Sequence, residues 1–144
     1  MTPIYKIAFN VVRTLIIFLS LLLLSIGLRW LFLPETMTTQ AAVIPNGILG
    51  WATFRADFGA FFIVGGITGI LATLKTRGAN YYLICCAMLI GFATLGRLIG
   101  FASDGVPEGG VTPLIVELTT LASLTALASL RARLSHIETQ ETAP

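Results

Sequence analysis

Four long apolar stretches, separated by short polar ones, set the pattern of this chain. They occupy residues 14–33, 56–74, 81–101 and 113–130. A bilayer hydrocarbon core about 30 Å thick is crossed by roughly 20 apolar residues in a helix. The pattern therefore predicts an all-α integral membrane protein. We expect residues 1–144 to form a single domain, an antiparallel bundle of four transmembrane helices.

Prolines and glycines mark where these helices end. Pro34 ends the first helix, and Asp104 with Gly105 fits a left-handed cap at the end of the third. Residues 34–54 form the longest predicted connection, which can act either as a lid over the bundle or as a passive tether. Residues 135–144 are polar, and we expect them to form a short frayed tail.

The basic residues indicate an orientation. Six of the nine lie at one predicted end of the bundle: Lys6, Arg13, Lys75, Arg77, Arg131 and Arg133. The positive-inside rule places this end in the cytoplasm, with residues 34–55 and 102–112 outside. The aromatic residues agree, because two fall at the outer boundary and three at the inner one: Trp30 and Trp51, then Tyr5, Tyr81 and Tyr82. We expect a multi-pass protein of a bacterial inner membrane with both termini cytoplasmic.

Composition supports a membrane protein and argues against a nucleic-acid-binding one. The chain is 56% hydrophobic and 11% charged, with a mean hydropathy of +0.89. Its net charge of +2 is small, and the basic residues are not gathered into one patch. The first apolar stretch is not a cleaved signal peptide by this pattern, because it continues through Arg29 to Leu33 without a small-x-small cleavage site.

Glycines predict close helix packing. The second predicted helix carries Arg55, Gly59, Phe62, Gly66, Gly69 and Thr73 along one stripe at spacings of three and four. Gly65 and Gly69 form a GxxxG pair, and Gly96 and Gly100 form another in the third predicted helix. Such pairs let membrane helices approach closely. We expect contacts within the bundle at both pairs, with self-association as the alternative.

Each predicted helix brings charge to about one turn below the outer surface. Four residues lie at this level, with a fifth at its rim and a sixth that could join them, and we call the set the charged layer: Arg29, Asp57, Arg97 and Glu117, then Arg55 at the rim, then Asp104. A charge in hydrocarbon costs about 2.5 to 3.5 kcal/mol on insertion scales, so these side chains should face the bundle interior and pair with one another. We expect Arg97 and Glu117 to be partners, and Asp104 to share the face of Arg97 if the helix extends that far.

Three roles fit such a layer. Its members can form salt bridges that fix helix register, bind a small anion, carboxylate or headgroup, or relay protons or ions. Excess arginine over Asp57 and Glu117 leaves room for an anionic ligand. Other partners that we expect are the lipid bilayer and, as open alternatives, other membrane proteins or a second copy of this chain.

Reaction chemistry is not indicated. Cys85 and Cys86 are adjacent, so they form neither a CxxC motif nor a metal site by themselves, and we expect two small buried thiols. His136 stands alone in the tail. We therefore predict a non-enzymatic protein without cofactor or metal that binds a partner or small anionic ligand at the charged layer. The competing class is an enzyme or a small proton-coupled carrier.

The order of these elements carries a family resemblance. Residues 55–59 after a turn-rich connection, Gly96-Arg97 with Asp104-Gly105 closing the same helix, and Glu117 in the last span resemble an uncharacterised bacterial four-helix membrane family defined only as a domain of unknown function. That resemblance implies a small inner-membrane protein and no particular activity. In size and layout the chain is also similar to the DoxX-like four-helix membrane proteins, some of which are linked to respiratory or thiol chemistry. This likeness implies a membrane redox-associated subunit as an alternative function.

Overall fold

The computed structural model describes the backbone of residues 3–74 and 78–141, and the side chains of residues 4–74 and 78–133. These residues form five helices: α1 (Pro3–Phe32), α2 (Pro34–Ala41), α3 (Gly47–Ala72), α4 (Ala79–Asp104) and α5 (Val111–Glu141). The first, third, fourth and fifth are each long and apolar enough to cross a membrane. The predicted all-α fold with four candidate membrane spans is confirmed.

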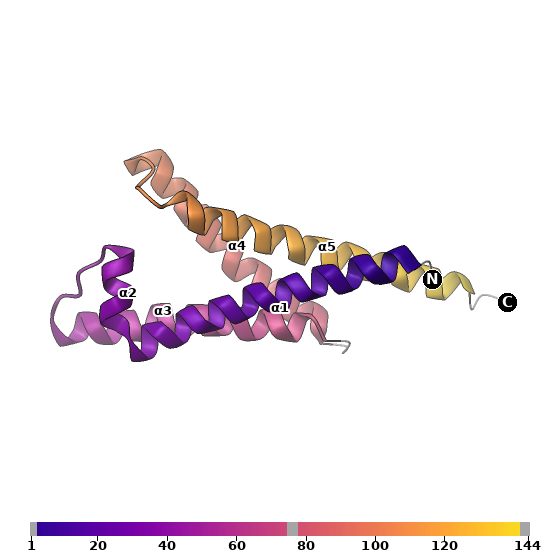
Figure 1. The fold of residues 1–144 in the computed structure, drawn as a ribbon, viewed down its shortest axis with the longest axis horizontal. Coiled ribbons are helices and arrows are strands. Elements are labelled where there is room, and N and C mark those ends of the chain that lie inside the picture. The colour runs from indigo at the N-terminus through magenta and orange to yellow at the C-terminus, as the bar shows by residue number, and fades with distance from the viewer. Residues whose placement is uncertain (1–2, 75–77, 142–144) are drawn as a thin grey trace.

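The four long helices pack in a ring. Helix α1 contacts α3 and α5, and α4 contacts the same two helices. Within the described part of the chain, the backbones of the two diagonal pairs, α1 with α4 and α3 with α5, do not approach each other closely. Both termini lie at one end of the bundle, which we call the terminal end (Figure 1). Helix α2 and the α4–α5 connection lie at the other, which we call the loop end.

The hydrophobic core occupies the half of the bundle nearer the terminal end. Its buried members are Phe9, Ile16, Leu23, Ala72, Leu83, Cys86, Ile90, Leu124 and Leu127. Toward the loop end, the α4–α5 hairpin diverges from α1 and α3 (Figure 1). We therefore describe two arms at that end: the α1–α3 arm, which includes α2, and the α4–α5 arm.

The helices extend past the apolar stretches that predicted them. Helix α3 begins at Gly47, so only residues 42–46 connect it to α2 without regular helix. Pro34 ends α1 as expected but also begins α2, because a proline in the first turn of a helix needs no amide hydrogen. Helix α5 continues to Glu141, where we expected a frayed tail from residue 135. Polar residues at such helix ends can lie among the lipid headgroups without breaking backbone hydrogen bonds.

Trp30 corrects part of the predicted aromatic belt. Its side chain is buried and stacks on the rings of Phe54 and Phe58, with centroid separations of 5.9 and 4.8 Å. Trp30 therefore joins α1 to α3 rather than facing the membrane interface. Tyr81 and Tyr82, by contrast, are exposed near the start of α4.

Glycines of α3 allow its backbone to lie against α1. A Cβ atom on Gly66 would be 2.7 Å from the Ser20 carbonyl oxygen and 2.9 Å from the Leu24 amide nitrogen, both of them backbone atoms that cannot rotate away. The predicted close packing of this stripe within the bundle is confirmed. The expectation for α4 is wrong, because a Cβ on Gly96 or Gly100 would meet no atom within 4 Å.

This difference predicts opposite effects of alanine at two helical glycines. Gly66→Ala should lower the free energy of unfolding by about 1 to 3 kcal/mol, because α1 and α3 must separate to admit the methyl group. Gly96→Ala should leave it unchanged or raise it by up to about 1 kcal/mol, because alanine has the higher helix propensity. Unfolding of both variants in the same detergent measures the effects, and equal losses would contradict the close contact.

Candidate functional site

The charged layer was predicted because its residues lie at similar distances from the ends of their helices. Contacts between helices show which of these residues are level with one another. Gly59 of α3 lies against Leu31 and the Gly27 backbone of α1, so Arg29 is level with Gly59. Arg97 of α4 meets Glu117 of α5. The layer nevertheless does not form one cluster, because the two arms diverge at this end of the bundle (Figure 1). Its members are divided between the α1–α3 arm and the α4–α5 arm.

Arg97 and Glu117 form the ion pair of the α4–α5 arm. Arg97 Nε donates to both carboxylate oxygens at 3.2 Å, and Nη2 donates to Oε1 at 2.8 Å. The side chains are 31% and 12% exposed, so the carboxylate is well covered while the guanidinium is partly accessible. Two nitrogens on one carboxylate give the forked geometry that makes arginine pairs directional. The predicted partnership of Arg97 and Glu117 is confirmed.

Arg29 has a partner that sequence reasoning missed. Its Nη2 donates to Oε1 of Gln40, near the end of α2, over a long distance of 3.4 Å. Helix α2 contacts both α1 and α3, and this places Gln40 beside the end of α1. No sequence pattern distinguishes Gln40 from the other polar residues of 35–40, because the helix that positions it was predicted as a loop.

Arg55 and Asp57 do not face the interior, which corrects the prediction. Both side chains are exposed, and neither has a hydrogen-bond or ion-pair partner within the described residues. The helix register explains Arg55: Gly59 packs on Leu31, one residue before α1 ends at Phe32. Arg55 lies one turn nearer the start of α3 and therefore extends past the end of α1. The predicted pairing of Arg55 and Asp57 with other members of the charged layer is absent from the described structure.

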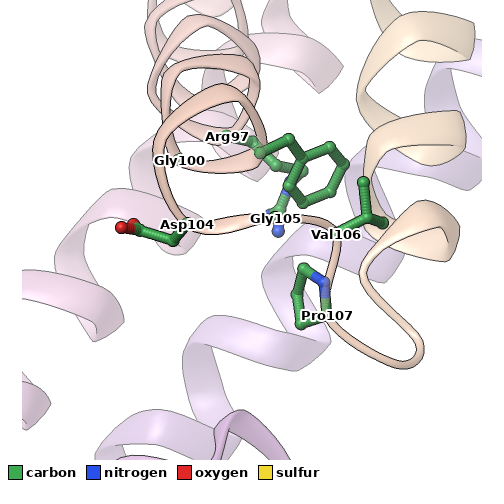
Figure 2. A pocket seen from close by; sticks show the side chains of 7 residues that line it. Arg97, Gly100, Asp104, Gly105, Val106 and Pro107 are labelled. Atoms are coloured by element: carbon green, nitrogen blue, oxygen red, sulfur yellow. The ribbon is translucent and has the colours of Figure 1, made fainter.

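Asp104 does not supply the missing negative charge. Helix α4 ends at Asp104 as predicted, but Gly105 has φ 89° and ψ 170°, so it does not adopt the predicted left-handed helical cap. The Asp104 carboxylate, however, is exposed and points away from Arg97 (Figure 2). Arg97 and Asp104 instead line a surface pocket of about 400 Å³ at the α4–α5 connection, together with Phe101 and Pro107.

A second pocket lies on the other arm, between α2 and the start of α3. It has a volume of about 610 Å³, and its lining includes Glu35, Thr39 and Trp51. Sequence reasoning gave this segment a possible lid function without assigning it a pocket. The two pockets lie on different arms and share no lining residue.

The cysteines differ from each other in environment. Cys86 is buried in the core, and its thiol donates to the Gly65 carbonyl oxygen at 3.5 Å. Cys85 is exposed, which corrects the expectation of two buried thiols. Within the described residues, no three His, Cys, Asp or Glu side chains are grouped so that they could hold a metal ion. His136 lies among the side chains that the structure does not describe.

At the terminal end, two arginines have contacts that the sequence did not suggest. Arg131 of α5 donates through Nη2 to the carbonyl oxygens of Ala72 and Leu74, the latter at 3.2 Å, and through Nη1 to Asn80 Oδ1 at 3.3 Å. It thereby binds the last carbonyls of α3. Arg13 of α1 is half-buried, and its Nε has no hydrogen-bond partner. An unpaired buried donor costs about 1 to 3 kcal/mol, and more when it is charged.

Comparison of the chain with protein-family models, curated proteins and solved structures found no match. Any assignment of function therefore depends on the residues and contacts of this chain.

The Arg97–Glu117 pair predicts a non-additive double mutant. Arg97→Met and Glu117→Gln should each lower the free energy of unfolding by about 1 to 3 kcal/mol, because each leaves one partner unpaired. This is below the about 3 to 5 kcal/mol of a fully buried pair, since Arg97 is about one-third exposed.

The double variant should recover part of the loss in a double-mutant cycle measured in detergent. Asp104→Asn is the matched control, because Asp104 lies on the same arm without a partner and its replacement should change nothing. Losses that simply add would show that Arg97 and Glu117 are not coupled.

Proposed function

We propose that this four-span membrane protein is non-enzymatic and binds a partner or a small anionic ligand at the loop end of its α1–α3 arm. The observation that carries the proposal is the exposure of Arg55 and Asp57 on a membrane helix, with no partner for either within the described residues. A charged group near the hydrocarbon boundary is stabilised only by water, headgroups or another charge. A partner outside this chain would supply that charge.

Free donors on this arm favour an anionic group. Arg29 makes one long hydrogen bond to an amide, and Arg55 makes none with the residues that the structure describes. A guanidinium carries five N–H donors in a fork that matches carboxylate or phosphate geometry. Arg97 on the other arm is already paired with Glu117, so it is the weaker candidate. Glu35 and Asp57 are the described carboxylates of the α1–α3 arm, and a cation of a protein partner could pair with Asp57.

The non-enzymatic part of the proposal has a separate basis. Of the two thiols, Cys86 is enclosed in the core and Cys85 faces outward, so they do not converge on a common cleft. An enzyme brings a nucleophile and a base, or metal ligands, to one cleft. The resemblance to the uncharacterised bacterial four-helix family stays a prediction, and the proposed function does not depend on it.

We further propose a bacterial inner-membrane location, with the terminal end in the cytoplasm. The described basic side chains of this end are Lys6, Arg13, Arg131 and Arg133, and the sequence adds Lys75 and Arg77 in the α3–α4 connection. An excess of Lys and Arg marks the cytoplasmic side of membrane proteins.

Substitutions at the exposed charges should separate binding from folding. Arg55→Gln and Asp57→Asn should keep the wild-type yield and unfolding midpoint, because neither side chain has a hydrogen bond or ion pair to lose within the described residues. Both should lose a protein or small molecule that co-purifies with the wild type from native membranes. Proteomics and native mass spectrometry of the purified material provide the measurement.

Glu108→Gln is the control, because it removes an exposed charge at the same end but on the α4–α5 connection. An identical set of co-purified molecules in all the variants would contradict the proposed site. Stoichiometric recovery of a metal or redox cofactor would contradict the non-enzymatic assignment.

Cysteine accessibility tests the orientation. In a chain carrying Cys85→Ser and Cys86→Ala, Asn46→Cys should react with an impermeant maleimide on cells whose outer membrane is open. Lys6→Cys should react only after lysis. Asn46 and Lys6 are exposed at opposite ends of the bundle, and Asn46 makes no side-chain cap bond. The reverse labelling pattern would show that the orientation is inverted.

A further inference from the structure

Two arginines of different helices lie together at the terminal end. Arg13 of α1 and Arg131 of α5 are close enough for their like charges to repel, and their helices are in contact. Arg131 is held in place by the carbonyl oxygens of Ala72 and Leu74 at the end of α3 and by the Asn80 side chain. The pair therefore sits where α1, α5 and the end of α3 converge, and one of its members is already fixed.

Arg13 lacks the partners that Arg131 has. It is half-buried, its Nε is covered, and no hydrogen-bond acceptor within the described residues reaches this nitrogen. Buried polar groups in folded proteins are nearly always hydrogen-bonded, so an exception indicates an acceptor that is not part of the chain shown. Because Nε itself is covered, an acceptor from outside the chain would reach the half-buried guanidinium at its terminal nitrogens, and an acceptor with negative charge suits a guanidinium best.

Among the side chains that the structure describes, none at this end is a carboxylate; Glu138 and Glu141, in the last turns of α5, lie outside the described side chains. Every described carboxylate belongs to α2, the loop-end halves of α3, α4 and α5, or the α4–α5 connection: Glu35, Asp57, Asp104, Glu108 and Glu117. Lys6 and Arg133 add further positive charge near the terminal end. Repulsion between Arg13 and Arg131 is therefore not balanced by any described acidic side chain, and it is stronger where water is scarce.

We propose that Arg13 and Arg131 form a binding site for the phosphate of an anionic phospholipid headgroup. Arg13 lies at the start of the first apolar stretch, and its neighbours Val11 and Leu15 are exposed apolar side chains along which acyl chains can lie. Basic pockets between membrane helices on the cytoplasmic side are known to hold such headgroups. This site is at the opposite end from the proposed function and is independent of it.

The test compares the wild type with Arg13→Met in nanodiscs of phosphatidylcholine alone and of phosphatidylcholine with phosphatidylglycerol. In phosphatidylcholine alone, Arg13→Met should raise the unfolding midpoint, because it removes an unpaired buried guanidinium and the repulsion of Arg131. With phosphatidylglycerol present, the order should reverse, because only the wild type gains the headgroup. A residue with a purely structural role would lower the midpoint in both lipids.

Retention of phosphatidylglycerol, measured by native mass spectrometry, gives the affinity. Arg13→Met should weaken it by about tenfold or more, as for loss of a charged hydrogen bond. Arg133→Met is the matched control, an exposed arginine of the same end, and should weaken it by at most about fivefold through general surface charge. Arg13→Lys keeps the charge without the forked geometry, so its affinity for phosphatidylglycerol should fall between those of Arg13→Met and Arg133→Met. It replaces Arg13→Met in the comparison if that variant does not fold.

Three results would overturn the proposal. The first is equal retention of phosphatidylcholine and phosphatidylglycerol by the wild type. The second is an equal loss in Arg13→Met and Arg133→Met. The third comes from a separate experiment with inorganic phosphate. If phosphate alone stabilises the wild type in phosphatidylcholine as much as phosphatidylglycerol does, the arginines bind a soluble phosphate and not a lipid headgroup.

Discussion

The close contact between α1 and α3 is the interaction on which the rest of the structure depends. Gly66 lies on the backbone of Ser20 and Leu24, and Gly27 lies on the backbone of Ile63 and Gly59. In a bilayer, apolar side chains are surrounded by lipid rather than water, so packing two helices together gains no hydrophobic free energy. The helices associate instead through dispersion contacts, which require close approach. Small residues on both helices make this approach possible along much of their length. The Trp30 stack on Phe54 and Phe58 extends the same contact to the loop end.

The α4–α5 hairpin lacks a comparable contact in its loop-end half. Gly91, Gly96 and Gly100 of α4 have no atom near where their Cβ would lie, and buried core residues of α4 end at Thr94. What links α4 to α5 at this level is the forked bond from Arg97 to Glu117. A polar bond between two helices of one hairpin does not attach that hairpin to the rest of the bundle. The charged layer is therefore split into two arms.

The sequence predicted a contact correctly where the same pattern also indicated the residue or helix on the other side of that contact. Apolar length predicted the four spans, and equal depth on consecutive antiparallel helices predicted Arg97 with Glu117. Glycine spacing predicted the α3 stripe, but the identical spacing at Gly96 and Gly100 predicted a contact that is absent. A GxxxG pair indicates that another helix could approach this backbone closely, but it does not indicate that a helix lies there. The sequence also did not show that α3 extends beyond α1, and that extension is what leaves Arg55 exposed.

The arginines show why position relative to an apolar stretch does not settle a residue's role. Arg97 is neutralised by a carboxylate, Arg131 binds the carbonyls that end α3, Arg29 reaches an amide, and Arg13 leaves a buried donor unpaired. All four lie within about two turns of the edge of an apolar stretch, so hydropathy treats them alike. Their differences arise from which helix end or side chain the fold brings beside each one. Unsatisfied donors, rather than charge alone, therefore identify the places where this membrane protein has capacity for a ligand.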